Sequence, residues 1–94
     1  MKVESKGPGL IRVEGKIDSS GAAEFEREML SRLSGEPAEI DFTDVDYISS
    51  AGLRVFLSAH KRMSKAGGLR LEGLRPVVRE VFDITGFSDI FEIA

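Results

Sequence analysis

Short apolar runs with a two-residue period alternate along this chain with runs that have the period of a helix. Ala38, Ile40 and Phe42 alternate with polar residues, as in a strand with one buried face. A polar loop is predicted to follow this strand at residues 44–48. The next apolar residues have helical spacing: Leu53, Phe56, Leu57, His60 and Met63. Such alternation is typical of an α/β protein built from layers.

The remaining segments extend the same pattern to both ends of the chain. A hairpin of two strands is predicted around Gly7-Pro8-Gly9, and its second strand runs to about Ile17. An amphipathic helix follows the capping residues Asp18-Ser19-Ser20-Gly21 and is expected to end near Ser34-Gly35. The later elements are a strand at residues 69–71, a helix from Pro76 that ends at Gly86, and a short strand at residues 91–93. The predicted fold is therefore α/β, with the order β-β-α-β-α-β-α-β, a mixed β-sheet with helices packed on it, and one domain over residues 1–94.

Composition and charge narrow the classes of function. The chain has 94 residues, no cysteine and a formal net charge of −3 at pH 7. It can form one modest core, and it has no thiolate for a disulfide, a metal site or a nucleophile. No apolar run approaches the roughly 20 residues needed to cross a bilayer, so we expect no membrane insertion and a cytoplasmic location. Because Lys and Arg are scattered, we expect no direct binding to nucleic acid.

Residues 46–54, which read Asp-Tyr-Ile-Ser-Ser-Ala-Gly-Leu-Arg, are the segment most informative about function. A strand is predicted to give way to a helix here, and α/β proteins usually build their sites at such strand ends. The first N–H groups of a helix carry partial positive charge, so a phosphate on a hydroxyl there is tolerated. On the residues alone, the simpler interpretation is that Ser49 or Ser50 only caps the helix.

This segment resembles the signature of STAS domains, a strand-loop-helix turn of the type Asp-Ser-Ser/Thr-Gly-Leu-Gly whose serine is phosphorylated by an anti-sigma factor kinase. Gly15-Lys16-Ile17-Asp18 resembles the family's first strand-to-helix turn. Further matches follow in the C-terminal part of the chain: Leu74, Pro76, Val81, Ile84, Gly86 and Phe91. The resemblance covers nearly the whole chain in the right order, and it implies a STAS-like domain of the anti-sigma factor antagonist type.

Carried over residue by residue, the resemblance makes Ser50 the phosphoacceptor, because it stands two residues before Gly52. It implies a partner-binding surface made of Asp18, Ser49, Ala51, Gly52, Leu53 and Arg54. Two departures from the family pattern matter: Ser49 replaces the usual aspartate, and Arg54 replaces the second glycine. Ser49 is therefore the next candidate for modification after Ser50.

The resemblance implies a binding module that is not an enzyme and needs no cofactor. When Ser50 is unphosphorylated, the chain is expected to bind an anti-sigma factor with serine kinase activity and so release a sigma factor. The kinase then phosphorylates Ser50 from ATP, and a serine phosphatase reverses the switch. Other family members are subunits of stress-sensing or lipid-transport complexes, and this alternative stays open.

The residues give little support to a catalytic or metal site. His60 is the only histidine, and it stands roughly 15 Å from Ser50 along the predicted helix, too far to act as its base. We expect His60 to be a partly buried structural residue. Asp41, Asp44 and Asp46 are expected on solvated faces and in loop caps rather than at a metal. A receiver-like domain phosphorylated on an aspartate is the third hypothesis, although the chain is short for that fold and lacks an acidic pair after its early strand.

Overall fold

The elements of the fold follow the predicted order. The computed structural model describes residues 2–33, 37–64 and 67–94. Its strands are β1 (Lys2–Gly7), β2 (Leu10–Ile17), β3 (Ala38–Ile48), β4 (Leu69–Glu72) and β5 (Glu92–Ile93). Its helices are α1 (Ala22–Ser31), α2 (Ser50–Met63) and α3 (Pro76–Ile84), with short 3₁₀ turns at η1 (Ser19–Gly21) and η2 (Phe87–Asp89). The prediction of an α/β fold with a mixed sheet is confirmed.

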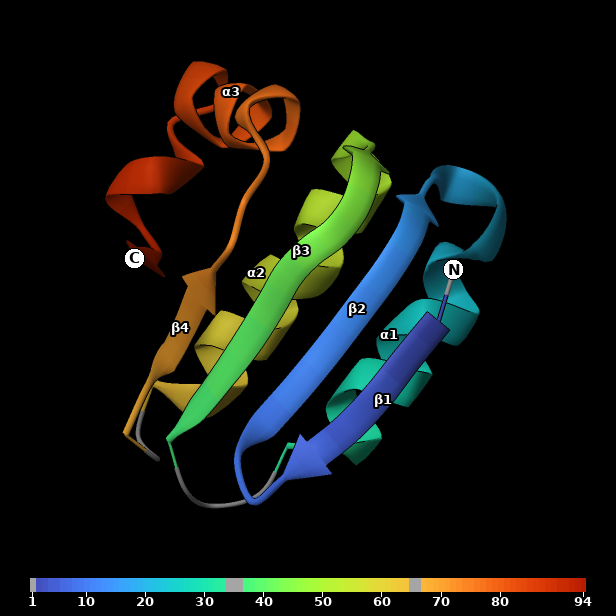
Figure 1. Ribbon diagram of the computed structural model, residues 1–94, viewed down its shortest axis with the longest axis vertical. Helices are drawn as coiled ribbons and strands as arrows, with labels where there is room; N and C mark the ends of the chain where they lie inside the picture. Colours follow the sequence, from blue (N-terminus) through green and yellow to red (C-terminus); the bar gives the residue numbers. More distant parts are fainter. Residues whose placement is uncertain (1, 34–36, 65–66) are drawn as a thin grey trace.

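The strands form one sheet in the order β1-β2-β3-β4-β5. β1 pairs antiparallel with β2, and the other neighbours are parallel. In Figure 1, α1 and α2 cover one face of this sheet, and α3 lies by the end of β3. The carboxyl ends of β2 and β3 therefore meet at one end of the sheet, where η1 and α2 begin.

An aromatic cluster holds the helices to the sheet. Phe25, Phe42, Phe56 and Phe82, which come from α1, β3, α2 and α3, are all 0% exposed. The Phe56 ring centroid lies 5.4 Å from that of Phe25 and 4.9 Å from that of Phe42. The Phe82 ring packs edge-on against Phe42 with centroids 6.0 Å apart. Because rings of this size contribute much of the buried apolar area, these contacts fix where each helix lies.

The prediction of a polar loop at residues 44–48 is wrong, because β3 continues to Ile48. Val45 and Ile48 are buried, with exposures of 0% and 2%, whereas Asp46 and Tyr47 between them are exposed. The pairing of β3 with β2 shifts register at two points. Such irregularities add a residue to one strand, so the buried residues are three apart here rather than two.

Two helix ends can be compared with their predicted positions. α1 ends at Ser31, and the predicted end at Ser34-Gly35 falls outside the described residues. α3 ends at Ile84, and Gly86 follows in the left-handed conformation with φ of 80°, as suits a helix stop. Within the described ranges, no helix is long and apolar enough to cross a membrane.

Candidate functional site

The ends of β2 and β3 are joined by a hydrogen bond at the start of α2. The Ser49 N–H donates to the carbonyl oxygen of Ile17, the last residue of β2, at 2.8 Å. Asp18 directly follows Ile17, and Ser50 directly follows Ser49. The structure therefore brings the backbone of Asp18 beside the turn that carries both serines.

Ser49 and Ser50 have different places at the start of α2. Ser49 has extended backbone angles, φ −93° and ψ 171°, and its Oγ accepts a hydrogen bond of 3.2 Å from the Gly52 N–H. Ser49 is therefore the N-cap. Ser50 is the first residue of the helix and is exposed, and no described residue forms a hydrogen bond with its hydroxyl. The cap leaves the Ser50 hydroxyl accessible.

Gly52 and Leu53 lie behind this turn rather than on the surface. Leu53 is only 2% exposed, so its side chain offers a partner no surface and supports the turn from within. A Cβ on Gly52 would lie 2.6 Å from Cγ2 of Ile17 and 3.1 Å from its carbonyl oxygen. Glycine therefore lets α2 begin directly against β2. Ala51 is half-buried and Arg54 is exposed, so these two can contact a partner.

Asp18 is the N-cap of η1 and carries a fixed negative charge. Its Oδ1 accepts hydrogen bonds from the Ser20 N–H at 3.2 Å and from the Ser20 hydroxyl at 2.7 Å. The Ser20 hydroxyl is the largest cause of a pKa of Asp18 below its ordinary value of 3.8. Because hydrogen bonds to the charged form favour it, Asp18 is ionised at neutral pH.

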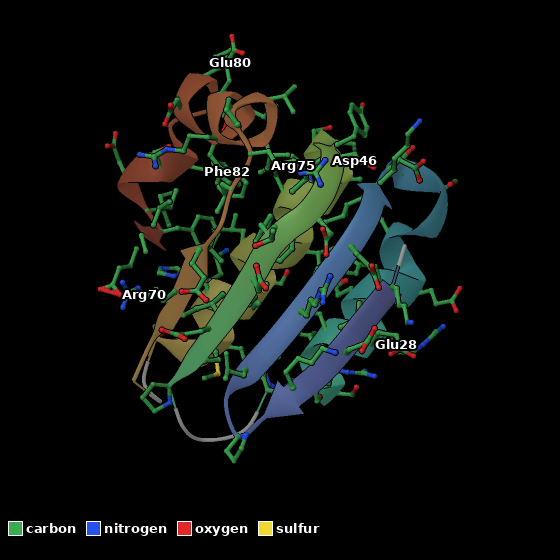
Figure 2. The ribbon with its side chains drawn as sticks, in the orientation of Figure 1. Glu28, Asp46, Arg70, Arg75, Glu80 and Phe82 are labelled. Atoms are coloured by element: carbon green, nitrogen blue, oxygen red, sulfur yellow. The ribbon has the colours of Figure 1, made fainter. Side chains whose placement is uncertain are left out.

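Arg75, for which the sequence gives no signal, organises the end of β3. Its Nε donates to the Thr43 carbonyl oxygen at 2.8 Å, and its Nη1 pairs with Asp46 at 2.7 Å. Figure 2 shows Arg75 and Asp46 pointing toward one another. Asp44 lies 3.7 Å from Arg75 and also pairs with Arg12 of β2. Because Asp46 and Arg75 are 29 residues apart, no local pattern could reveal this pair.

Within the part of the chain that the structure describes, the acidic and histidine side chains do not gather into a metal site. In residues 2–33, 37–64 and 67–94, no group of three or more such side chains is placed to hold a metal ion. Asp41 accepts a hydrogen bond of 2.9 Å from the Thr43 N–H. His60 is partly buried near the far end of α2 and packs edge-on against Phe91 with ring centroids 5.3 Å apart. The predicted partial burial of His60 is confirmed.

The fold and the strand-to-helix turn at Ser49 define the class of protein. The STAS domain family model matches residues 1–94, and the chain belongs to that family. Its relatives include BtrV of Bordetella bronchiseptica, named as a candidate anti-sigma factor antagonist, which is 42% identical over 85 residues. That match covers 87% of this chain and 73% of BtrV. The anti-sigma-B factor antagonist of Bacillus subtilis is 39% identical over 87 residues, 89% of this chain and 79% of the relative.

Solved structures show the same fold. The anti-sigma factor antagonist SpoIIAA in its unphosphorylated form matches with a TM-score of 0.77 at 18% identity, over 99% of this chain and 86% of that one. The phosphorylated form of SpoIIAA from Bacillus matches with a TM-score of 0.66 at 18% identity, over 99% and 89% of the two chains. The sequence relatives are named as anti-sigma factor antagonists, and this chain is a STAS protein of their type.

Proposed function

We propose that the chain is an anti-sigma factor antagonist that is switched by phosphorylation of Ser50. Its unphosphorylated form binds an anti-sigma factor with serine kinase activity, and this binding releases a sigma factor. The contact is the Ser50 surface, which we define as Asp18, Ser49, Ser50, Ala51 and Arg54. The kinase then phosphorylates Ser50 and dissociates, and a serine phosphatase restores the binding form. The proposal places this cycle in the cytoplasm, where ATP is present.

The accessible hydroxyl of Ser50 at the first residue of α2 carries the proposal. Ser49 already caps the helix, so the Ser50 oxygen is available for transfer without loss of the cap. In the transfer, this oxygen forms a bond to the γ-phosphorus of ATP as the bond to ADP breaks, and the hydroxyl proton passes to a base of the kinase. The positive end of α2 then favours the phosphate.

Tyr47 adds an aromatic side chain next to this surface. It is 49% exposed, and its Cα pairs with that of Lys16 at the end of β2. Tyrosine is one of the residues that most often carries binding energy at protein interfaces. We therefore include Tyr47 at the edge of the proposed contact.

A phosphorylation assay with paired serine variants tests the function. The wild-type chain is incubated with the anti-sigma factor that co-purifies with it and with labelled ATP. Ser50→Ala should keep partner binding and lose the label, because the hydroxyl is the acceptor but contributes little contact area. Ser49→Ala should keep the label and lose about 0.5–2 kcal/mol of stability with the cap. A full label on Ser50→Ala would make Ser49 the acceptor.

The chemistry of the label and the identity of the partner test the alternatives. Phosphoserine is stable in acid, whereas an acyl phosphate on aspartate is labile, so an acid-labile label would contradict the proposal. A co-purified ATPase with a kinase fold is expected. If transport proteins co-purify consistently instead of such an ATPase, the chain is better interpreted as a subunit of a lipid-transport complex.

A further inference from the structure

Arg54 is an exposed cation on the same side of α2 as Ser50. The two residues are four positions apart in one helix, so their side chains lie one above the other on a shared face. Both residues are exposed. Side chains at this spacing are neighbours, and an arginine can reach a charged group one turn away. A glycine at position 54, as in the family pattern that the sequence resembles, could not do so.

The guanidinium of Arg54 is uncommitted in the unphosphorylated protein. No ion pair joins it to a carboxylate of the described residues. Arg75, which also lies at this end of the sheet, is held instead by the Thr43 carbonyl oxygen and by Asp46. Asp18 accepts its hydrogen bonds from Ser20. Arg54, one helical turn from Ser50, is therefore placed to receive a new anion on that residue.

We propose that Arg54 is the intramolecular counter-ion of the phosphate on Ser50. This inference rests on the proposed phosphorylation of that serine. A phosphoserine carries about −1.5 to −2 charges and three strong acceptor oxygens, and the planar guanidinium can donate two parallel hydrogen bonds to them. Phosphorylation then has two effects on the Ser50 surface: it adds negative charge, and it withdraws the one exposed arginine of that surface from the partner.

The phosphate itself can report this contact without any partner protein. Phosphoserine is incorporated at position 50 of the full chain by genetic encoding, and its second pKa, about 6 in an unperturbed phosphoserine, is measured by ³¹P NMR titration. A nearby cation favours the dianion and so lowers this pKa. We expect the value in the wild-type chain to lie about 0.3–0.5 pH unit below that in Arg54→Gln, and the difference to shrink at 1 M salt.

Three further variants make the test specific. Arg54→Lys should recover part of the shift, because it keeps the charge but not the planar fork. Arg62→Gln removes an exposed cation from the last turn of α2, and Arg75→Gln removes the one held by Asp46; neither should change the phosphate pKa. Equal pKa values in the wild type and Arg54→Gln, or a shift caused by Arg75→Gln alone, would overturn the proposal.

The titration tests the contact between Arg54 and the phosphate independently of the proposed function. The titration uses phosphoserine that no kinase has to install, so it can fail while the chain still binds and is modified by an anti-sigma factor. Conversely, if the kinase assay fails, the proposed function is contradicted. The pKa of the phosphate at position 50 can still be compared between the wild type, the Arg54 variants and the control variants.

Discussion

Gly52 lies so close to Ile17 that a Cβ on Gly52 would come within 2.6 Å of the Ile17 Cγ2 atom. Ile17 is 0% exposed, and its carbonyl oxygen accepts the Ser49 N–H at 2.8 Å. Neither its side chain nor its backbone can move away without disturbing the turn that carries both serines. The start of α2 is therefore fixed by close packing as well as by its cap.

Gly52→Ala should destabilise the protein even though alanine is the better helix former. Helix propensity alone predicts a gain of up to about 1 kcal/mol. Inserting a methyl group into a filled space typically costs about 1–3 kcal/mol, and here one contact is with backbone, which cannot rotate away. We expect a net loss of about 1–2 kcal/mol in urea unfolding. Ala51→Gly, the adjacent control, should lose only about 0.5–1 kcal/mol. A higher unfolding midpoint for Gly52→Ala would contradict this account of the turn.

Phe56→Ala should be the most destabilising of these substitutions. Phe56 is 0% exposed and packs against the rings of Phe25 and Phe42. Truncating a buried phenylalanine leaves a cavity between α1, α2 and the sheet and costs about 3–5 kcal/mol. Ile84→Ala is the control, because Ile84 is 76% exposed and its truncation should change stability by less than about 0.5 kcal/mol. Similar losses in the two variants would mean that the aromatic cluster is not the core.

Most of the fold could be predicted because its strands and helices each have a regular apolar period. The exception is the second half of β3, where Val45 and Ile48 are buried three positions apart. The acidic residues Asp44 and Asp46 suggested a loop, yet they are balanced by Arg12 and Arg75 from other parts of the chain. Only the tertiary structure supplies those cations, so no local reading of the sequence could have recognised the strand.

The strand-to-helix turn of the candidate site could be located from the sequence, but the places of its residues could not be told apart. Either serine could have been the N-cap, and the structure assigns the cap to Ser49 through its bond from the Gly52 N–H. From the sequence, Leu53 belongs both to the apolar stripe of α2 and to the predicted partner surface. Its side chain is only 2% exposed, so it is part of the core. The position of this turn also depends on the hydrogen bond from the Ser49 N–H to the Ile17 carbonyl oxygen, a long-range contact that no local pattern reveals.

Acid should weaken the fold through Asp41 on β3. The Thr43 hydroxyl is the largest cause of a pKa of Asp41 below its ordinary value of 3.8. Because the folded-state pKa is the lower one, this stabilisation is fully present above the unfolded pKa and is lost as pH falls through the folded one. Melting temperatures should therefore decrease below about pH 4. Asp41→Asn and Thr43→Val should each show a shallower decrease, and an unchanged slope in both would exclude this hydrogen bond as a cause.

Arg54→Glu should separate binding from stability. Arg54 is exposed and forms no ion pair with a described carboxylate, so its replacement should change stability by no more than about 0.5 kcal/mol. The partner should bind more weakly, because the surface loses a cation and gains a charge of the same sign as Asp18. Arg62→Glu, near the end of α2, controls for net charge and should leave affinity unchanged. If Arg54→Glu binds the partner with unchanged affinity, the interface lies elsewhere on the protein.

Phosphorylation of Ser50 should act at the interface without refolding the domain. The phosphate adds about −1.5 to −2 charges at the positive end of α2, where a negative charge is favoured by roughly 0.3–1 kcal/mol. Circular dichroism should therefore be unchanged, and the melting temperature should change by only a few degrees.

On the Ser50 surface, the added charge exceeds what Arg54 can neutralise and lies near the ionised Asp18. Burying such a surface against a partner costs several kcal/mol, and each 1.4 kcal/mol lowers affinity tenfold. Affinity measured for chains with phosphoserine or serine at position 50 should therefore differ by at least about 100-fold. Equal affinities, or loss of secondary structure on phosphorylation, would refute this mechanism.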